Sequence, residues 1–337
     1  MPTMWALQNK TPYAAERTWV RDKDGHHHWV VAVKATFDVD DAGRLRPADE
    51  QEPPLPAPVY WGEAGHSSLR FEAELVAPKP HTDVLVNACA HAPGERPAPS
   101  VEVAVRIHDV DKMLVVHGER YYTRGLTGVK PSSPKPFVTQ PILYEWAWGG
   151  TDTHDADARK HVSDMRNPIG QGVASREARL VDQPAHRIEY LRGHPAKSGP
   201  AGFGPIASYW SPRLELAGTF DEAWRKTRHP LLPRNFDERF ALCAPADQRP
   251  SRRLVGGEKV ALVHLTPKGS LHFTLPRLSF GFATYFGAVR RFHEATLGTV
   301  VIEPEVKKVR MVLQTGLSVG PRDVDRLDFT AITERTD

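Results

Sequence analysis

Glycine and proline limit the length of every helix that this chain can form. The 337 residues include 30 prolines and 25 glycines, and because these are spread along the chain, one of them occurs roughly every six residues. A proline inside a helix removes a backbone hydrogen bond and clashes with the preceding turn, whereas short strands joined by loops tolerate such spacing. We therefore predict a mainly β protein. Its antiparallel sheets should form a sandwich or barrel-like structure with long Gly/Pro-rich loops and a few short helices.

Alternation of apolar and polar residues marks the strands. In "HWVVAVKATFDV" the alternate apolar side chains from Trp29 to Val39 fall on one face, and Lys34 falls on the other with further polar residues. This period of two is typical of a half-buried strand. Residues 18–39 are predicted to form a hairpin that turns at Asp24 and Gly25.

The same pattern predicts further strands along the chain. Residues 82–91, 101–107 and 112–122 should continue as an antiparallel meander. The segments "GEKVALVHL" and "LHFTLPRL" should pair as a hairpin around "TPKGS". Two more strands are expected near the end, in "TVVIEP" and "VRMVLQTGLSV".

Two short helices are predicted, each of about two turns. In "TFDEAWRKTRHP", Thr219 and Glu222 have the spacing of a capping box, and a proline follows. In "NFDERFALCAP" the second helix should begin at Asn235. The chain then divides into three regions: an N-terminal antiparallel β region (1–122), a Gly/Pro/aromatic-rich loop region with a short helix (123–235) and a C-terminal β region (236–337). These regions form either one continuous domain or two intertwined domains.

Composition and charge indicate which kinds of partner the chain is not expected to bind. Hydrophobic residues make up 40% and charged residues 25% of the chain, as in an ordinary globular protein, and the formal net charge is +3. The basic pairs are scattered and interrupted by acids, so no nucleic-acid partner is expected. The N-terminus has no charged and apolar leader, and no apolar stretch approaches the length of a membrane span, so we expect a cytoplasmic protein without a membrane partner. These basic pairs are Arg252-Arg253, Arg290-Arg291 and Lys307-Lys308.

Candidate metal and catalytic residues do not form a recognisable site. His26, His27 and His28 lie on a predicted strand, where neighbouring side chains point to opposite faces, so no metal and no cofactor are expected. Cys89 and Cys243 are far apart and are expected to be buried, reduced thiols. Sequence motifs for a serine nucleophile, a zinc protease or a phosphate loop are missing, and we expect no enzyme, although a glycosidase with two distant carboxylates stays open.

The stretch "GPAGFGPIASYWSP" resembles a phosphate-binding loop but lacks its chemistry. Pro200 and Pro205 have no N–H group to offer an anion, and no lysine follows. Within the segment 144–224, Trp148 and Phe203 stand directly beside glycine. Irregular loops that proline restrains lose little conformational entropy when they bind a partner, and aromatic residues dominate binding hot spots. This segment is predicted to supply most of the partner-binding surface, with Trp146 and Trp224 equally open to a place in the core. The candidate contact residues are Trp148, Tyr209, Trp210 and Arg213.

Several motifs, taken in order, resemble those of one protein family. The chain contains "NKTPY", "VVAVKATFDVDDAGRL", "SSLRFEAELVAPKPHTDVLVNACAHAP", "VHGERYY", "YEWAWGGTD", "NPIGQG", "PAGFGP" and "GGEKVALVHLTPKGSLHFTLP". This set is similar to an uncharacterised-domain family encoded beside the spike genes of type VI secretion. The resemblance runs from Asn9 to Pro276, and it departs from the family pattern at "LVDQPAHRIEY" and at Tyr122, where tryptophan is common. No resemblance is seen in the tail, 277–337.

The resemblance implies a function without a catalytic residue. Members of the family are regarded as adaptors or chaperones that help to load a toxic effector, often one with a PAAR-like domain, onto the VgrG spike. The expected partners are therefore such an effector and the VgrG spike protein, and "GPAGFGPIASYW" is interpreted as a loop that holds a shape. A carbohydrate-active or carbohydrate-binding β-protein is the alternative, and a nucleic-acid binder would require the basic pairs to converge on one face.

Overall fold

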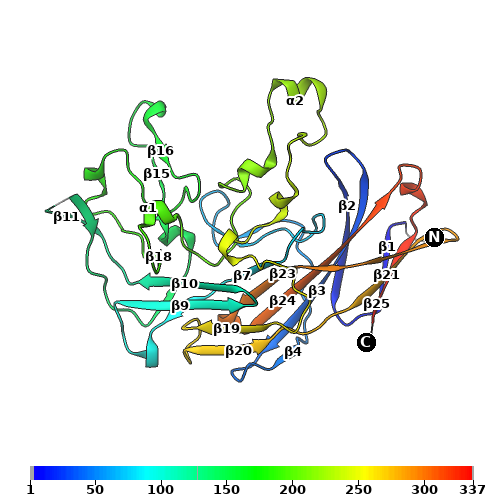
Figure 1. Ribbon diagram of the computed structural model, residues 1–337, viewed down its shortest axis with the longest axis horizontal. Coiled ribbons are helices and arrows are strands. Elements are labelled where there is room, and N and C mark those ends of the chain that lie inside the picture. The colour runs from blue at the N-terminus through cyan, green and yellow to red at the C-terminus, as the bar shows by residue number, and fades with distance from the viewer. Residues whose placement is uncertain (1–3, 127, 336–337) are drawn as a thin grey trace.

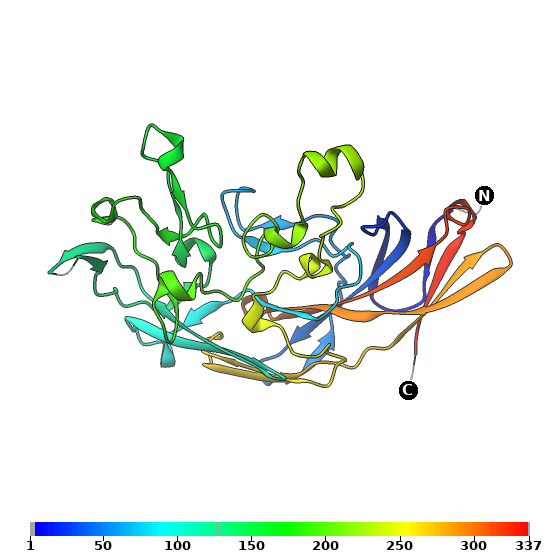
Figure 2. The ribbon, with the colours of Figure 1, turned by 45° about the horizontal axis from the view of Figure 1, so that its top comes forward.

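The protein is built mainly from β-strands that form several mostly antiparallel sheets. The computed structural model describes residues 4–126 and 128–335. Three larger sheets follow one another along the long axis of the molecule, and the loops of the middle third of the chain rise from one side of them (Figures 1 and 2). This confirms the predicted fold class.

A six-stranded sheet lies at the centre and joins the two ends of the chain. Strand β3 pairs on one side with β2, across a turn at residues 22–25 that contains the predicted Asp24 and Gly25, and on the other with β24, nearly three hundred residues later. The N-terminal and C-terminal β regions therefore share one sheet. In order, its strands are β2 (Ala14–Arg21), β3 (His27–Val39), β24 (Lys308–Val319), β23 (Thr296–Glu303) and β7 (Asp83–Val86), and β4 (Leu45–Pro47) also pairs with β3.

Two further sheets flank the central one and share its hydrophobic core. The five-stranded sheet consists of β18 (Ile188–Tyr190), β10 (Val110–His117), β9 (Ser100–Ile107), β19 (Lys259–Val263) and β20 (Ser270–Thr274). The four-stranded sheet consists of β1 (Ala6–Asn9), β25 (Phe329–Glu334), β21 (Phe280–Phe286) and β22 (Val289–Glu294). Side chains from all three sheets, among them Val33, Val105 and Phe282, belong to one buried cluster.

Short elements complete the chain. The two-stranded pairs are β5 (Val59–Tyr60) with β6 (Leu69–Phe71), β8 (Cys89–His91) with β13 (Thr139–Pro141), β11 (Tyr122–Gly125) with β12 (Gly128–Pro131), β14 (Trp148–Gly149) with β17 (Gln171–Gly172), and β15 (Thr151–Asp152) with β16 (Val162–Ser163). The α-helices are α1 (Pro195–Ser198) and α2 (Glu222–Thr227). The 3-10 helices are η1 (Pro93–Glu95), η2 (Tyr144–Trp146), η3 (Ala158–Lys160), η4 (Glu177–Leu180), η5 (Leu214–Ala217), η6 (Glu238–Ala241), η7 (Ala246–Gln248), η8 (Pro304–Val306) and η9 (Val324–Arg326).

Several local predictions need correction. Helix α2 is capped by Asp221, whose side chain accepts a hydrogen bond from the backbone of Trp224, and not by Thr219. The second predicted helix is the short 3-10 helix η6, which Asp237 caps, because its hydrogen bonds close three-residue turns only. Strand β7 is not part of the predicted meander, since it pairs in parallel with β23. The alternating strands β21 and β22 were missed, as were β1 and β25.

Strand β3 is buried on both faces, so the prediction of a half-buried strand was wrong. Its apolar face packs in the core as expected, but Lys34 on the other face is only 1% exposed. The Lys34 ammonium lies 3.1 Å from the Glu74 carboxylate, and Gln51 bonds the backbone of Thr36 through both ends of its amide. The segment 48–75 thus covers the polar face with groups that bond the Lys34 ammonium and the Thr36 backbone. Burial raises the pKa of Glu74, although Lys34 acts against this shift.

A second buried ion pair joins three distant parts of the chain. The Lys79 ammonium donates to the Asp83 carboxylate at 2.7 Å and to the Thr299 hydroxyl at 2.9 Å. The same carboxylate accepts the backbone N–H groups of Cys243 and Ala244, at 2.9 and 3.0 Å. Burial alone would lower the pKa of Lys79, but the Asp83 carboxylate raises it to about 12. The pair therefore remains charged at neutral pH and fixes the 243–244 loop to the central sheet.

Replacing Asp83 by asparagine should destabilise the protein strongly. The change leaves the Lys79 ammonium buried without an anion, which is expected to lower the free energy of unfolding by about 3–5 kcal/mol. Urea denaturation of the D83N variant measures this loss. Asp111→Asn is the matched control, because the Asp111–Arg106 pair is solvent-exposed and should contribute less than about 1 kcal/mol. Equal losses in the two variants would contradict the role given to Asp83.

Both cysteines should react slowly with thiol reagents in the native protein. Cys243 is fully buried, and burial raises the pKa of each thiol to about 12. Since the thiolate is the reactive form, only about one thiol in ten thousand is ionised at pH 8 by this pKa. Titration with Ellman's reagent should detect both thiols after denaturation and neither at an early time before it. Rapid stoichiometric labelling of the folded protein would contradict this expectation.

Candidate functional site

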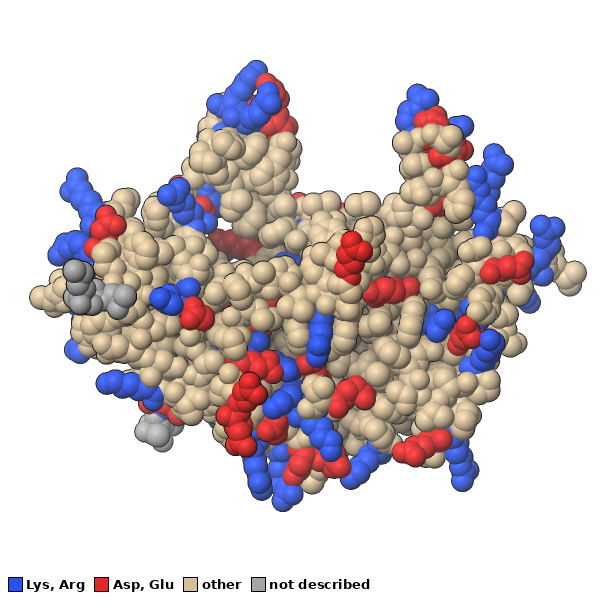
Figure 3. All heavy atoms as spheres, turned by 180° about the vertical axis from the view of Figure 1, so that it is seen from behind, with Lys and Arg blue, Asp and Glu red and all other residues tan. Residues whose placement is uncertain are grey.

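Two protrusions stand on the same side of the sheets and frame a hollow. The first, the β15–β16 protrusion, comprises residues 150–164, and the second, the α2 protrusion, comprises residues 218–235 (Figures 1 and 2). Charged side chains gather at both tips, and the hollow between them, which we call the saddle, is visible in the space-filling view (Figure 3). Both protrusions come from the segment between the N-terminal and C-terminal β regions.

The β15–β16 protrusion is fixed at its base by the carboxylate of Asp152. One of its oxygens accepts hydrogen bonds from the backbone and the hydroxyl of Ser175, both at 2.8 Å, and the Arg179 guanidinium donates to it at 3.0 Å. The backbone of His154 donates to the other oxygen. These hydrogen bonds, with that of the Ser175 backbone the strongest, hold the pKa of Asp152 well below its usual range. The hairpin is therefore held in one orientation over its base.

The α2 protrusion is fixed by aromatic packing and by its own polar groups. The Phe220 and Trp224 rings pack edge to face with centroids 4.8 Å apart, and the Trp224 indole donates to the carbonyl of Leu231 at 2.9 Å. At the base, Asn235 bonds both the backbone and the hydroxyl of Thr219. Phe220 is 55% exposed despite this packing. The protrusion thus presents a large apolar side chain on an ordered loop.

A pocket of about 570 Å³ lies between the bases of the two protrusions, and we call it the arginine pocket. Arg166 enters it just after the β15–β16 protrusion, and Leu216 just before the α2 protrusion. Its floor is the 244–249 loop that the Lys79–Asp83 pair anchors. Its charged lining residues are Arg166, Arg192, Arg213, Arg249 and Asp247.

A second pocket, of about 700 Å³, contains a chain of hydrogen-bonded side chains, and we call it the histidine pocket. The Tyr122 hydroxyl lies 2.7 Å from Nδ1 of His186, and Nε2 of His186 lies 3.0 Å from the Glu189 carboxylate. Arg120 also pairs with Glu189. The Trp148 ring packs edge-on against His186, with centroids 5.3 Å apart.

The pKa values in the histidine pocket explain how its protons are arranged. Burial lowers the pKa of His186 and raises that of Tyr122. Burial would also raise the pKa of Glu189, but hydrogen bonds from His186 and Arg120 lower it to about 2. At neutral pH the tyrosine therefore donates to a neutral imidazole, which donates to the carboxylate. Both imidazole nitrogens are engaged, so this chain orders the pocket wall.

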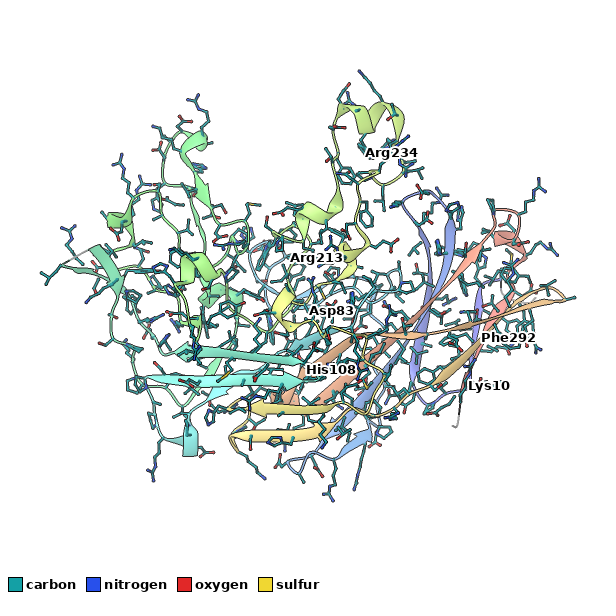
Figure 4. The ribbon with its side chains drawn as sticks, in the orientation of Figure 1. Lys10, Asp83, His108, Arg213, Arg234 and Phe292 are labelled. Carbon is teal, nitrogen blue, oxygen red and sulfur yellow. The ribbon has the colours of Figure 1, made fainter. Side chains whose placement is uncertain are left out.

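The structure separates the four predicted contact residues. Trp210 is fully buried and packs edge-on against Tyr144, with ring centroids 5.7 Å apart. Arg213 is also buried, pairs with Glu72 and donates to the carbonyl of Phe240 at 2.8 Å, and its side chain lines the arginine pocket (Figure 4). Tyr209 is half-buried beside Trp210.

Trp148 is half-buried and lines the histidine pocket instead. The two tryptophans left open between core and surface, Trp146 and Trp224, are both half-buried. Trp146 lies under the Arg187 guanidinium, 4.8 Å from the ring centroid. The aromatic residues of this segment therefore mostly hold its loops in place, and the surface that they leave open is the saddle.

Residues that sequence reasoning missed include Arg192, Arg249 and the Tyr122–His186–Glu189 chain. No spacing in the sequence joins them, because the pockets are closed by loops that come together only in the fold. A partial signal was the excess of glycine around Trp148: at Gly172, a Cβ atom would lie 2.6 Å from the Trp148 ring and 2.5 Å from the Tyr122 hydroxyl. Only glycine allows this close approach.

The scattered basic pairs are matched by nearby acceptors. Lys307 lies 2.8 Å from Asp41, and Lys308 lies 2.6 Å from Asp38. Arg253 donates to the carbonyls of Lys79 and Pro80. On the face seen in Figure 3, basic and acidic side chains alternate over the body of the molecule.

The described part of the chain contains neither a metal-binding cluster nor a membrane-spanning helix. Residues 4–126 and 128–335 hold no group of three or more histidine, cysteine or carboxylate side chains placed to bind a metal ion. Over the same residues, no helix has the length and the apolar character that crossing a bilayer requires.

Comparison with known proteins identifies the family. The model of the family described as "uncharacterized protein conserved in bacteria (DUF2169)" matches residues 24–314. The chain belongs to this family. The match to DUF2169 begins later than the resemblance at Asn9 suggested and extends beyond Pro276, so that β21 to β23 and most of β24 belong to the family region. No curated protein and no solved structure matches the chain.

Truncation of Trp210 should destabilise the protein. Removing this fully buried ring leaves a cavity beside Tyr144 and is expected to cost about 3–5 kcal/mol. Trp61→Ala is the control, because Trp61 is 42% exposed and its loss should cost about 1 kcal/mol or less. Chemical denaturation of the two variants measures the difference. A W210A variant as stable as W61A would show that Trp210 is free to serve a partner instead.

Proposed function

We propose that this member of the DUF2169 family is a non-enzymatic adaptor or chaperone of type VI secretion in the cytoplasm. It binds an effector that carries a PAAR-like domain and promotes loading of the effector onto the VgrG spike. The ordered set of motifs that resembles the spike-associated family supports this proposal. The observation that carries it is the saddle between two fixed protrusions.

The saddle has the properties of a surface that receives a folded partner. Asp152 bonds the β15–β16 protrusion to Ser175 outside it, and Arg228 of the α2 protrusion donates to the carbonyl of Lys23. Both protrusions are thereby restrained, so that binding costs little conformational entropy. Large apolar side chains are exposed on or next to both protrusions. They are Val162 and Met165 beside the first and Leu214 and Phe220 beside the second.

Exposed apolar side chains on opposite sides of a hollow favour a protein partner over a small molecule. A domain seated in the saddle would contact both protrusions at once, and its binding energy would come from a few large side chains at the centre of the contact. Phe220 is the largest of these exposed side chains. The charged tips would then lie at the polar rim of the interface.

Replacing Phe220 by aspartate should reduce partner binding without unfolding the protein. The affinity-tagged chain is expressed in its native host, and the proteins that co-purify with it are identified by mass spectrometry. A PAAR-like effector and VgrG are expected to co-purify with the wild type. At least about tenfold less of both is expected with F220D, because the loss of a hot-spot aromatic side chain costs about 2 kcal/mol of binding free energy.

Phe292→Asp is the matched control for this experiment. Phe292 is 66% exposed and lies on β22, at the end of the molecule away from the saddle (Figure 4). Its replacement should leave co-purification unchanged. The adaptor proposal fails if neither a PAAR-like protein nor VgrG co-purifies with the wild type. The role of the saddle fails if F220D and F292D retain the partner equally.

A further inference from the structure

The charge balance of the arginine pocket points to a specific kind of occupant. We propose that this pocket binds an acidic side chain, flanked by apolar residues, on a segment of the partner protein, and that Arg192 and Arg249 recognise its carboxylate. This inference rests on the proposed function, since it takes the partner to be the protein that sits in the saddle. The inference adds the chemical character of the partner segment that enters the arginine pocket.

Most charges around the pocket are already paired. The Arg166 guanidinium lies 2.6 Å from the Asp164 carboxylate, and Arg213 pairs with Glu72. Asp247, the acidic residue of the lining, accepts a hydrogen bond from the buried Lys112 at 2.9 Å. These three pairs leave no net charge among them, so they do not attract an ion of either sign.

Two arginines of the lining remain without a carboxylate. In the part of the chain that the structure describes, neither Arg192 nor Arg249 has a carboxylate oxygen within 4.0 Å of its guanidinium nitrogens. Arg192 is exposed at the edge of the pocket. Arg249 is half-buried, and its Nε group donates to the carbonyl of Ala244 at 2.8 Å. The pocket therefore carries two positive charges that no carboxylate of residues 4–126 and 128–335 pairs with directly.

Burial is unfavourable for the positive charge of Arg249. Burial lowers the pKa of Arg249, and the nearby guanidinium groups of Arg213 and Arg239 act in the same direction. Asp83 acts against them, but that carboxylate is already bonded to Lys79 and to two backbone N–H groups. A half-buried cation among other cations gains most from an incoming anion, because the low local dielectric strengthens the new pair.

The shape and the walls of the pocket select a carboxylate on an apolar segment. A guanidinium group presents its N–H donors in a planar fork that matches a carboxylate. Much of the remaining lining is apolar and includes Pro200, Ile206, Leu216 and Pro245. A free inorganic anion would leave these walls in contact with water, whereas apolar residues next to the acidic one would cover them. Because residues at the bases of both protrusions line the pocket, such a segment would lie beneath a domain bound in the saddle.

The proposal is tested with a displayed library of random short peptides as the probe. The purified, immobilised full-length protein selects peptides, and their sequences are compared with the unselected library. Peptides with aspartate or glutamate next to apolar residues should be enriched with the wild type. The enrichment of acidic residues should fall about tenfold with Arg192→Gln and further with Arg249→Gln, since each change removes one charge-assisted contact.

Arg46→Gln is the matched control for these variants. Arg46 is exposed on β4 and has no carboxylate within 4.0 Å among the described residues, so that its replacement changes the net charge by the same amount away from the pocket. Enrichment should be unchanged in this variant. Since Arg192 is exposed, R192Q should fold normally, and it keeps the test decisive even if R249Q is unstable.

The outcomes separate the pocket from the adaptor role. Selection without acidic residues, or acidic enrichment that persists equally in R192Q, R249Q and R46Q, overturns the carboxylate site. Co-purification from the native host is measured with the same variants. If a PAAR-like partner binds R192Q and R249Q with the same yield as the wild type, the proposed carboxylate site is wrong and the adaptor proposal stands. If the enrichment of acidic peptides depends on both arginines but no PAAR-like partner co-purifies, the carboxylate site is supported and the adaptor proposal is wrong.

Discussion

The buried ion pair of Lys79 and Asp83 connects the central sheet to the surface where binding is proposed. Asp83 begins β7, and its carboxylate holds the backbone of Cys243 and Ala244, from which the floor of the arginine pocket continues to Arg249. A loop without regular hydrogen bonds needs such partners if it is to be buried, because unpaired backbone groups are costly away from water. The Asp83 carboxylate thus accepts backbone hydrogen bonds that a neighbouring strand would otherwise accept, and it holds the floor of the pocket in place.

The same principle explains the polar face of the central sheet. Lys34, Arg310 and Glu303 point away from the hydrophobic core and are covered by the segment 48–75 and its neighbours, which bring Glu52 and Glu74. A covering segment could pack on a hydrophobic face in many positions. Ion pairs restrict it to the few positions in which the opposite charges meet. The long loops of this protein are ordered for this reason, although glycine and proline keep them from forming long helices or strands.

Two fixed protrusions over an ordered floor suit the proposed adaptor better than a catalytic role. The histidine pocket contains titratable groups, but His186 is bonded at both ring nitrogens, and its chain of hydrogen bonds orders the wall beside Trp148. In the arginine pocket, Arg192 and Arg249 have no carboxylate partner among the residues that the structure describes. The proposed binding surface would thus combine apolar side chains for affinity with two cations for specificity.

The sequence by itself determined much of the strand pattern of this protein, although it did not reveal β1, β21, β22 and β25. Alternation placed β3, β9, β10, β19, β20, β23 and β24, and the spacing of glycine and proline excluded long helices, because both signals depend only on neighbouring residues. The tertiary structure decided which faces are covered and which side chains meet. Lys34 lies on the polar side of the alternation and is buried only because the segment 48–75 covers it. Trp210, a predicted contact residue, is fully buried beside Tyr144. Arg192 and Arg249 line one pocket because their two loops come together in the fold. These contacts join residues far apart in the chain, so no local pattern encodes them.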